Sequence, residues 1–154
     1  MLFLLLCLDS DCYALDASQV VEILPLVSIR KMLRSPQGVV GTINYHGTFV
    51  PIVDFSEMVL GRQAPRRLST RILLLRCPGQ EGQPCLVGLV AEKATEVMRC
   101  EQADFVSAGI TNVAAPYLGG IVTRPQGLVQ RIELGKLLPA VLGDFVIEQP
   151  ALSQ

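Results

Sequence analysis

The side chains that could carry acid–base or nucleophilic chemistry in this chain are few and widely spaced. His46 is the only histidine among 154 residues, so clusters of histidine metal ligands are excluded, and any histidine base would have to be this residue. Asp54 precedes a short apolar segment, where a carboxylate is typical of a helix N-cap. Glu22 and the later acidic residues are too dispersed to indicate a carboxylate pair. The sequence therefore predicts no enzyme, no cofactor and no metal site.

Cysteine usage bears on the redox setting of the chain. The cysteines are odd in number and include no C-x-x-C pair, so neither a disulfide framework nor a zinc site is predicted. Free thiols in a reducing compartment are expected instead. The five residues are Cys7, Cys12, Cys77, Cys85 and Cys100.

Composition narrows the class of protein further. Half of the chain is apolar, only 18% is charged and the formal charge is −1, which suits one domain with a sizeable core. No basic run is present to neutralise phosphates, so no nucleic-acid partner is predicted. The apolar start meets Asp9 and Asp11 where a signal peptide would need small residues, and the long uncharged stretches contain Pro and Gly. A cytoplasmic domain with no direct membrane insertion is expected.

The stretch GTINYHGTFVPIVDF, residues 41–55, predicts the element around which the chain is organised. Two runs rich in β-forming residues, Val39–Tyr45 and Thr48–Phe55, flank His46-Gly47, and a glycine there can take the positive φ of a tight hairpin turn. Pro51 has no N–H for a sheet and is expected at an edge or a bulge. A hairpin followed by a helical turn capped by Asp54 is predicted.

An internal repeat indicates that the chain consists of two similar β-rich units. Tyr13–Leu24 resembles Val87–Met98, and the central hairpin resembles Gly119–Leu134, so that Asp54 corresponds to Glu133. Units this small bury little surface alone, and we expect them to share an apolar seam. Further strands are predicted at Leu2–Leu8, Cys12–Leu15, Val20–Leu24, Thr70–Cys77, Leu86–Ala91, Tyr117–Thr123 and Leu128–Leu134, and short helices at Ser56–Leu60 and Leu134–Leu142.

Four segments, taken in order, resemble the CheW-like domain family. Residues 41–55 look like the family signature, in which a Gly-x-x-Asn-x-Arg-Gly turn precedes a Val/Ile-Pro-Val/Ile-Val/Ile-Asp-Leu strand. QVVEI (Gln19–Ile23) and VGLVAEKATEV (Val87–Val97) resemble two further family elements. YLGGIV and LVQRIELGKLL, within Tyr117–Leu138, resemble the closing hairpin and helix.

This resemblance implies a mainly β fold of two SH3-like five-stranded β-barrels with short helices, packed on a common hydrophobic interface. It implies one domain over 1–154, with subdomains of roughly 14–68 and 70–147, each completed by exchanged strands. Members of the family are non-catalytic adaptors. They couple the cytoplasmic helical hairpin of a methyl-accepting chemoreceptor to the regulatory domain of a CheA-type histidine autokinase, in cytoplasmic arrays at membrane-bound receptors.

The resemblance also suggests two sets of contact residues. The receptor-binding residues would be Glu22, Ile23, Asn44, His46, Val87 and Gly120. The kinase-binding residues would be Val21, Gly41, Thr42 and Gly47. His46 replaces the arginine of the family's turn, so a permanent cation is exchanged for a mostly neutral ring. The alternative reading is a small-ligand or enzymatic barrel that uses the cleft between the subdomains, for which Asp54, His46 and Glu22 would have to converge.

Overall fold

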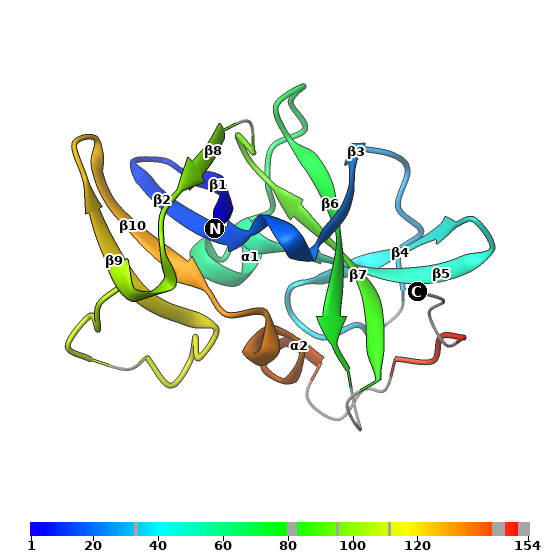
Figure 1. The fold of residues 1–154 in the computed structure, drawn as a ribbon. Coiled ribbons are helices and arrows are strands. Elements are labelled where there is room, and N and C mark those ends of the chain that lie inside the picture. The colour runs from blue at the N-terminus through cyan, green and yellow to red at the C-terminus, as the bar shows by residue number, and fades with distance from the viewer. Residues whose placement is uncertain (33, 80–82, 95, 111, 143–146, 151–154) are drawn as a thin grey trace.

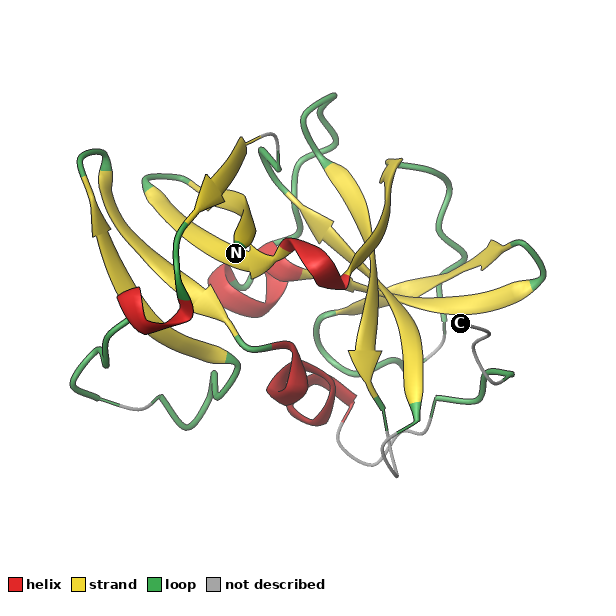
Figure 2. Cartoon of the chain, in the orientation of Figure 1, coloured by secondary structure: helices red, strands yellow, loops and turns green. Residues whose placement is uncertain are grey.

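Two five-stranded sheets form the chain in a computed structural model, which describes all residues except 33, 80–82, 95, 111, 143–146 and 151–154. Sheet A has the strand order β8 (Glu96–Arg99), β1 (Leu2–Leu8), β2 (Asp11–Asp16), β10 (Gly127–Ile132) and β9 (Leu118–Arg124). Sheet B has the order β3 (Val20–Pro25), β6 (Arg71–Pro78), β7 (Pro84–Ala91), β5 (Thr48–Asp54) and β4 (Val39–Tyr45). Figures 1 and 2 show the two sheets side by side.

Short helices connect and cover these sheets. They are α1 (Phe55–Leu60), α2 (Leu134–Leu142) and the 3-10 turns η1 (Ala17–Gln19) and η3 (Gln102–Asp104). The mainly β class with two five-stranded units and short helices is thereby confirmed. Pro139 lies inside α2. None of the helices in the described ranges is long and apolar enough to cross a bilayer.

The internal repeat is confirmed by the identical strand order of the two sheets. In each sheet a central hairpin, β1–β2 or β6–β7, has an edge strand on one side, β8 or β3. On its other side it pairs in parallel with a second hairpin, β10 of β9–β10 or β5 of β4–β5. The first repeat runs from β1 to α1 and the second from β6 to α2. Each repeat places its first hairpin in one sheet and its next three strands in the other. The two sheets therefore exchange strands reciprocally.

Strand exchange explains why some strands have almost no polar face. In β1, Leu4, Leu6 and Leu8 belong to the large buried cluster that draws on both sheets, whereas Phe3 and Leu5 point into the interior of sheet A. Strand β6 alternates in the same way, with Leu73 and Leu75 in the shared cluster and Ile72 and Leu74 in the interior of sheet B. Because side chains alternate across a strand, burial on both faces requires a continuous apolar run. The shared cluster is the predicted seam.

The central hairpin forms as predicted. Strands β4 and β5 pair from Val39 opposite Val53 to Tyr45 opposite Thr48, and His46 and Gly47 make the turn with φ of 50° and 90°. Two positive φ values in a two-residue turn match the right-handed twist of the flanking strands. Gly47 N–H also donates to Asn44 Oδ1 over 2.8 Å, which fixes the turn. The hairpin projects at one end of the molecule (Figure 1).

Pro51 lies in an internal strand, and pairing explains how the sheet tolerates it. Strand β5 pairs with β7 only from Ile52 opposite Gly88 onward, so the missing N–H of Pro51 falls just outside that ladder. Where β5 has separated from β7, the Leu86 N–H and C=O are bonded instead by the side-chain amide of Gln149, each over 2.8 Å. Backbone polar groups at this gap are thereby satisfied.

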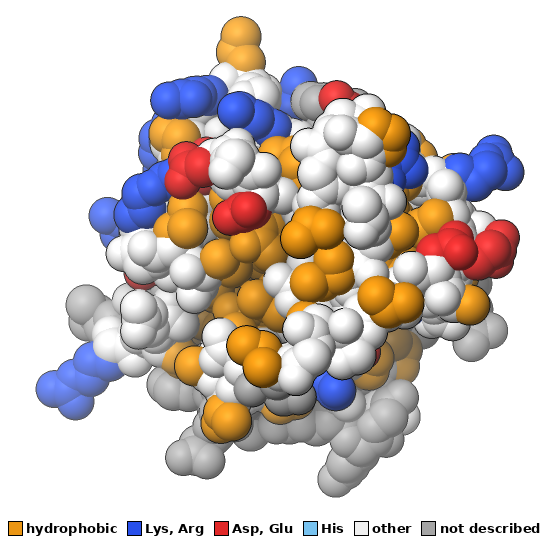
Figure 3. Space-filling model, turned by 90° about the vertical axis from the view of Figure 1, so that its left-hand side faces the viewer, with side chains coloured by type: hydrophobic (Ala, Val, Ile, Leu, Met, Phe, Trp, Pro, Cys, Tyr) orange, Lys and Arg blue, Asp and Glu red, His pale blue; other side chains and the backbone are white. Residues whose placement is uncertain are grey.

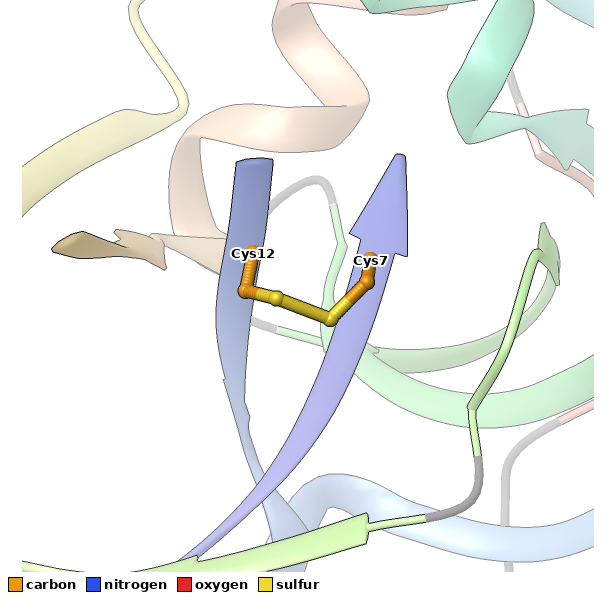
Figure 4. The surroundings of a disulfide bond; sticks show 2 residues. All are labelled: Cys7 and Cys12. Carbon is orange, nitrogen blue, oxygen red and sulfur yellow. A yellow bond between two sulfur atoms is a disulfide. The ribbon is translucent and has the colours of Figure 1, made fainter. Parts of the chain in front are cut away.

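A disulfide between Cys7 and Cys12 corrects the expectation that all cysteines are free (Figure 4). The two residues face each other across β1 and β2, with Cα atoms 4.1 Å apart, so the register of the hairpin brings their side chains together. The number and spacing of the cysteines do not reveal this pair, because it depends on the strand register that the Asp9-Ser10 turn sets. Cys77, Cys85 and Cys100 are free thiols, the first two buried.

Candidate partner-binding surfaces

One end of sheet B brings several of the predicted contact residues together through Tyr45. The Tyr45 hydroxyl donates to Glu22 Oε2 over 2.6 Å, and the His46 ring meets the Tyr45 ring edge-on at 4.4 Å between centroids. Glu22 belongs to β3 and Tyr45 to β4, which are the two edge strands of sheet B. The hydrogen bond therefore closes the open side of the sheet. It also raises the pKa of the Tyr45 hydroxyl, because the hydrogen bond to Glu22 favours the protonated form.

Gly41 lets the segment after β3 pack closely against β4, behind the same surface. The backbone of Thr42 exchanges two hydrogen bonds with that of Arg30, over 2.9 and 2.8 Å, and so holds the segment after β3 against β4. A Cβ on Gly41 would lie 2.1 Å from the carbonyl oxygen of Arg30, which is impossible without moving that segment. Gly41 is buried and Thr42 half-buried. The structure thus gives Gly41 a packing role.

Gly120 occupies the corresponding place in the second repeat. Strand β9 carries a matching bridge, in which Ile121 and Val106 exchange hydrogen bonds over 2.7 and 2.8 Å. A Cβ on Gly120 would lie 2.9 Å from the Val106 carbonyl oxygen. The registers of the two hairpins make Gly41 equivalent to Gly120 and Thr42 equivalent to Ile121.

Ile23 extends the apolar seam to the edge of sheet B. It lies opposite Leu73 of β6, whose side chain is in the shared cluster, and paired residues in an antiparallel sheet point to the same face. Ile23 is nevertheless 47% exposed, as is its neighbour Val21 at 45%, because β3 has no further strand beside it. Exposed apolar residues on a sheet edge are suited to contact a partner.

The predicted contact residues therefore divide into two groups. Those on β3, β4 and the hairpin turn lie at one end of sheet B: Val21, Glu22, Ile23, Gly41, Thr42, Asn44, His46 and Gly47. Val87 is fully buried in the seam and Gly120 lies in sheet A. Any effect of Val87 on binding would have to act through the packing of the two sheets.

Asp54 is engaged in structure, as its N-cap prediction required. Its carboxylate accepts the backbone N–H groups of Glu57 over 3.1 Å and Ala64 over 2.9 Å. Burial raises the pKa of Asp54 above its ordinary value, although these hydrogen bonds oppose the shift. Glu22 and His46, in contrast, both contact Tyr45. The convergence that a catalytic cleft would need is therefore not formed by these three residues.

A second polar network joins the two repeats and was not predicted. Buried Glu92 accepts a hydrogen bond from the Ser56 hydroxyl at the start of α1, and its Oε2 lies 3.5 Å from Arg62 Nη1. The other Arg62 nitrogen, Nη2, lies 3.4 Å from Asp9 Oδ1 in the β1–β2 turn. The network ties α1 to the first hairpin. Among the described residues, no group of three His, Cys, Asp or Glu side chains is arranged to hold a metal ion.

Sheet A presents a different, more apolar end. Figure 3 views the molecule from the side of β9 and β10, and hydrophobic side chains gather in the middle of this face. The exposed apolar residues of β8–β10 and the loop before β9 are Val97, Val106, Ile110, Val113 and Leu128. The corresponding segment after β3 adds the cations Arg30, Lys31 and Arg34 to its exposed Val27 and Met32. Equivalent positions in the two repeats therefore offer different chemistry.

The residues that sequence reasoning missed are Tyr45 and Arg30. Tyr45 was assigned only to the strand, although its phenol is the group that connects Glu22 to the hairpin. Arg30 lies in a segment without strand periodicity, and its backbone bridge to Thr42 leaves no pattern in the side chains. The sole local signal was the glycine before Thr42, which marks a close approach of two backbones.

The geometry defines a class of protein: a duplicated β-sheet domain whose exposed edges and hairpins can contact partners. The model of the CheW-like domain matches residues 2–141, so the chain belongs to the CheW-like domain family. It is therefore an adaptor domain of chemotaxis signalling, and scaffolding domains of this family are non-catalytic.

Comparison with solved structures supports the fold. The scaffolding protein TtCheW from Thermoanaerobacter tengcongensis superimposes with a TM-score of 0.75 and 22% sequence identity, over 89% of this chain and 86% of that chain. A search of curated protein sequences found no match.

Proposed function

We propose that this domain couples the cytoplasmic helical hairpin of a chemoreceptor to the regulatory domain of a CheA-type histidine kinase, in the cytoplasm at membrane-bound receptor arrays. Membership of the CheW-like family is the observation that carries this proposal. It is supported by the group of exposed edge and hairpin residues around Glu22, Ile23 and His46, which is rigidly held by Tyr45. Weak individual contacts suffice in an array, because several linked contacts add avidity.

The proposed receptor contact is the apolar edge that Ile23 adds to the seam. A receptor hairpin presents an amphipathic helical surface, and such a surface binds where apolar side chains border a groove. Glu22 and Asn44 flank this edge with polar groups, and His46 covers Tyr45 at the turn. Gly120 would take part from sheet A, and Val87 would act only indirectly, through the packing of the seam.

The proposed kinase contact consists of Thr42 on β4, Gly47 in the hairpin turn and Val21 on β3. Gly41 supports it by holding the Arg30 segment in place. We also propose the expected division into subdomains of roughly 14–68 and 70–147, each completed by exchanged strands. The pairing of β6 and β7 with β3–β5, and of β1 and β2 with β8–β10, supports such an exchange.

The receptor contact is tested by Ile23→Asp with Val97→Asp as its matched control. Val97 is the equivalent edge residue of sheet A, 61% exposed and opposite Leu4 of the shared cluster. Ile23→Asp should abolish capture of a receptor cytoplasmic fragment with an unchanged circular dichroism spectrum, while Val97→Asp should retain capture.

Equal capture by Ile23→Asp and wild type would contradict the assignment of the receptor to this edge. Loss of capture by both variants would contradict the assignment to sheet B alone. Wild-type protein that captures neither receptor fragment nor kinase regulatory domain would contradict the coupling function itself.

A further inference from the structure

The two central hairpins each carry a pair of cysteines that face one another across the strands. Cys7 lies opposite Cys12 in β1–β2, and Cys77 lies opposite Cys85 in β6–β7. The hairpins hold equivalent places in sheets A and B. The first pair is oxidised and the second is free. The same chain therefore contains one oxidised and one reduced pair of cysteines, each pair facing across a hairpin.

The two pairs differ in access to solvent and in thiol chemistry. Cys7 and Cys12 are half-buried beside the β1–β2 turn, whereas Cys77 is 0% and Cys85 6% exposed in the seam. Burial, with the neighbouring Cys85 as a smaller cause, raises the pKa of Cys77 to about 12. Burial also raises the pKa of Cys85. Because the thiolate is the species that exchanges, the second pair is inert at neutral pH.

We propose that Cys7 and Cys12 are a reversible thiol–disulfide exchange site, and that Cys77 and Cys85 in the other hairpin remain reduced. A disulfide in a cytoplasmic protein is usually transient or redox-sensing, because cellular dithiols keep thiols reduced. One part of the proposal rests on the proposed function: that the domain is cytoplasmic, where it would meet such reductants. The exchange itself is a property of the chain.

The reaction is a two-electron exchange with a dithiol reductant. One thiolate of the reductant attacks the sulfur of Cys7 or Cys12, the bond between them breaks, and the released cysteine takes up a proton. The second thiol of the reductant then attacks the mixed disulfide and releases the other cysteine. The chain gains two electrons and two protons, and the reductant leaves as its own disulfide.

The oxidised hairpin is connected to the rest of the domain at its turn. Arg62 contacts Asp9 of this turn and buried Glu92, and the N–H of Cys7 donates to the Glu92 carbonyl over 3.4 Å. Breaking the cross-link frees the strands on either side of Asp9 and loosens the Arg62 contact. The redox state of Cys7 and Cys12 thereby reaches the start of α1 through Glu92 and Ser56.

The experiment compares the four cysteines in the folded full-length protein purified without reductant. Native protein is treated with dithiothreitol, alkylated with iodoacetamide at pH 8, and digested for mass spectrometry. Cys7 and Cys12 should be unlabelled before treatment and labelled after it. Cys77 should react on the order of 100-fold more slowly, since its smaller thiolate fraction outweighs its higher intrinsic nucleophilicity.

Hydrogen exchange supplies the second measurement. Reduction should accelerate exchange of the Leu8 and Asp11 amides by roughly 30-fold, the order expected when a short cross-linked loop is released, and diamide should reverse it. Exchange of Leu73 in β6 should not change.

The proposal is overturned if Cys7 and Cys12 are still labelled after the protein has been oxidised with diamide, because the bond then does not form. It is equally overturned if dithiothreitol acts on this pair only in denaturant that also exposes Cys77, because the bond is then a permanent structural link. A Cys12→Ser variant checks access to Cys7, which should be alkylated in the folded state.

Discussion

Replacing Gly41 by alanine should destabilise the domain more than the same change at either of two matched glycines. The new Cβ would lie 2.1 Å from the Arg30 carbonyl oxygen, and the Gly41 backbone has a φ of 156°. The Arg30 segment would have to move away and lose both backbone hydrogen bonds to Thr42. The expected loss is about 3–5 kcal/mol, from two lost bonds and an unfavourable backbone conformation.

Two control variants separate steric contact from backbone conformation. Gly47 has a φ of 90° with open space around its Cβ position, so Gly47→Ala should cost about 1–2 kcal/mol for conformation alone. Gly120 has a 2.9 Å contact to the Val106 carbonyl oxygen, and Gly120→Ala should cost about 1–3 kcal/mol for local overpacking. Gly41→Ala combines both effects.

Urea denaturation followed by circular dichroism measures the free energy of unfolding of all three variants. For a chain of this size, Gly41→Ala should also lower the Tm by roughly 10 °C. A Gly41→Ala variant within 0.5 kcal/mol of wild type, measured to about that precision, would refute the packing role of Gly41. So would a larger loss in Gly47→Ala. If Gly41→Ala weakens kinase binding, the measured free energy of unfolding shows how much of the weaker binding comes from loss of folded protein.

Three further predictions concern titration, capping and the cross-link. The pKa of Cys77 is raised to about 12 in the folded state, from 9 in the unfolded state. The buried, protonated thiol therefore contributes fully to the free energy of unfolding below pH 9, and this contribution is lost as the pH rises towards 12. Wild type should therefore lose about 2 kcal/mol more than Cys77→Ala between pH 8.5 and 10.5 in urea denaturation. Asp54→Ala removes a cap that accepts two N–H groups and should cost about 1–2 kcal/mol at pH 7 by the same assay, and no loss would contradict the capping role. Oxidised wild type should be about 2 kcal/mol more stable than Cys7→Ser/Cys12→Ser, from the entropy of a short closed loop, and equal stabilities would contradict the cross-link.

Local structure was predictable wherever a residue type has one strong physical reason for its place. The His46-Gly47 turn, the Asp54 cap and the β-rich runs were all expected from backbone conformation and alternation. The strand at Leu2–Leu8 was predicted, and the seam explains why both of its faces are apolar. The family resemblance added the double five-stranded architecture, which the family match and the solved structure confirm.

Contacts between distant segments were not predictable from the same patterns. The hydrogen bond of Tyr45 to Glu22 depends on two edge strands meeting across the open side of a sheet. The Cys7–Cys12 bond depends on the exact register of a turn, which cysteine counting ignores. The equivalence of Thr42 and Ile121 in the repeat likewise depends on strand register, which side-chain similarity does not reveal.

The reciprocal exchange of strands has a consequence for synthesis on the ribosome. When the first repeat has emerged, β3, β4 and β5 still lack the hairpin on which they must assemble, and β1–β2 lacks its own neighbours. Neither half can reach its final structure until β6 and β7 have left the exit tunnel. The chain therefore behaves like two mutually dependent subunits joined by a tether, and its unpaired strands need shielding from aggregation until translation is nearly complete.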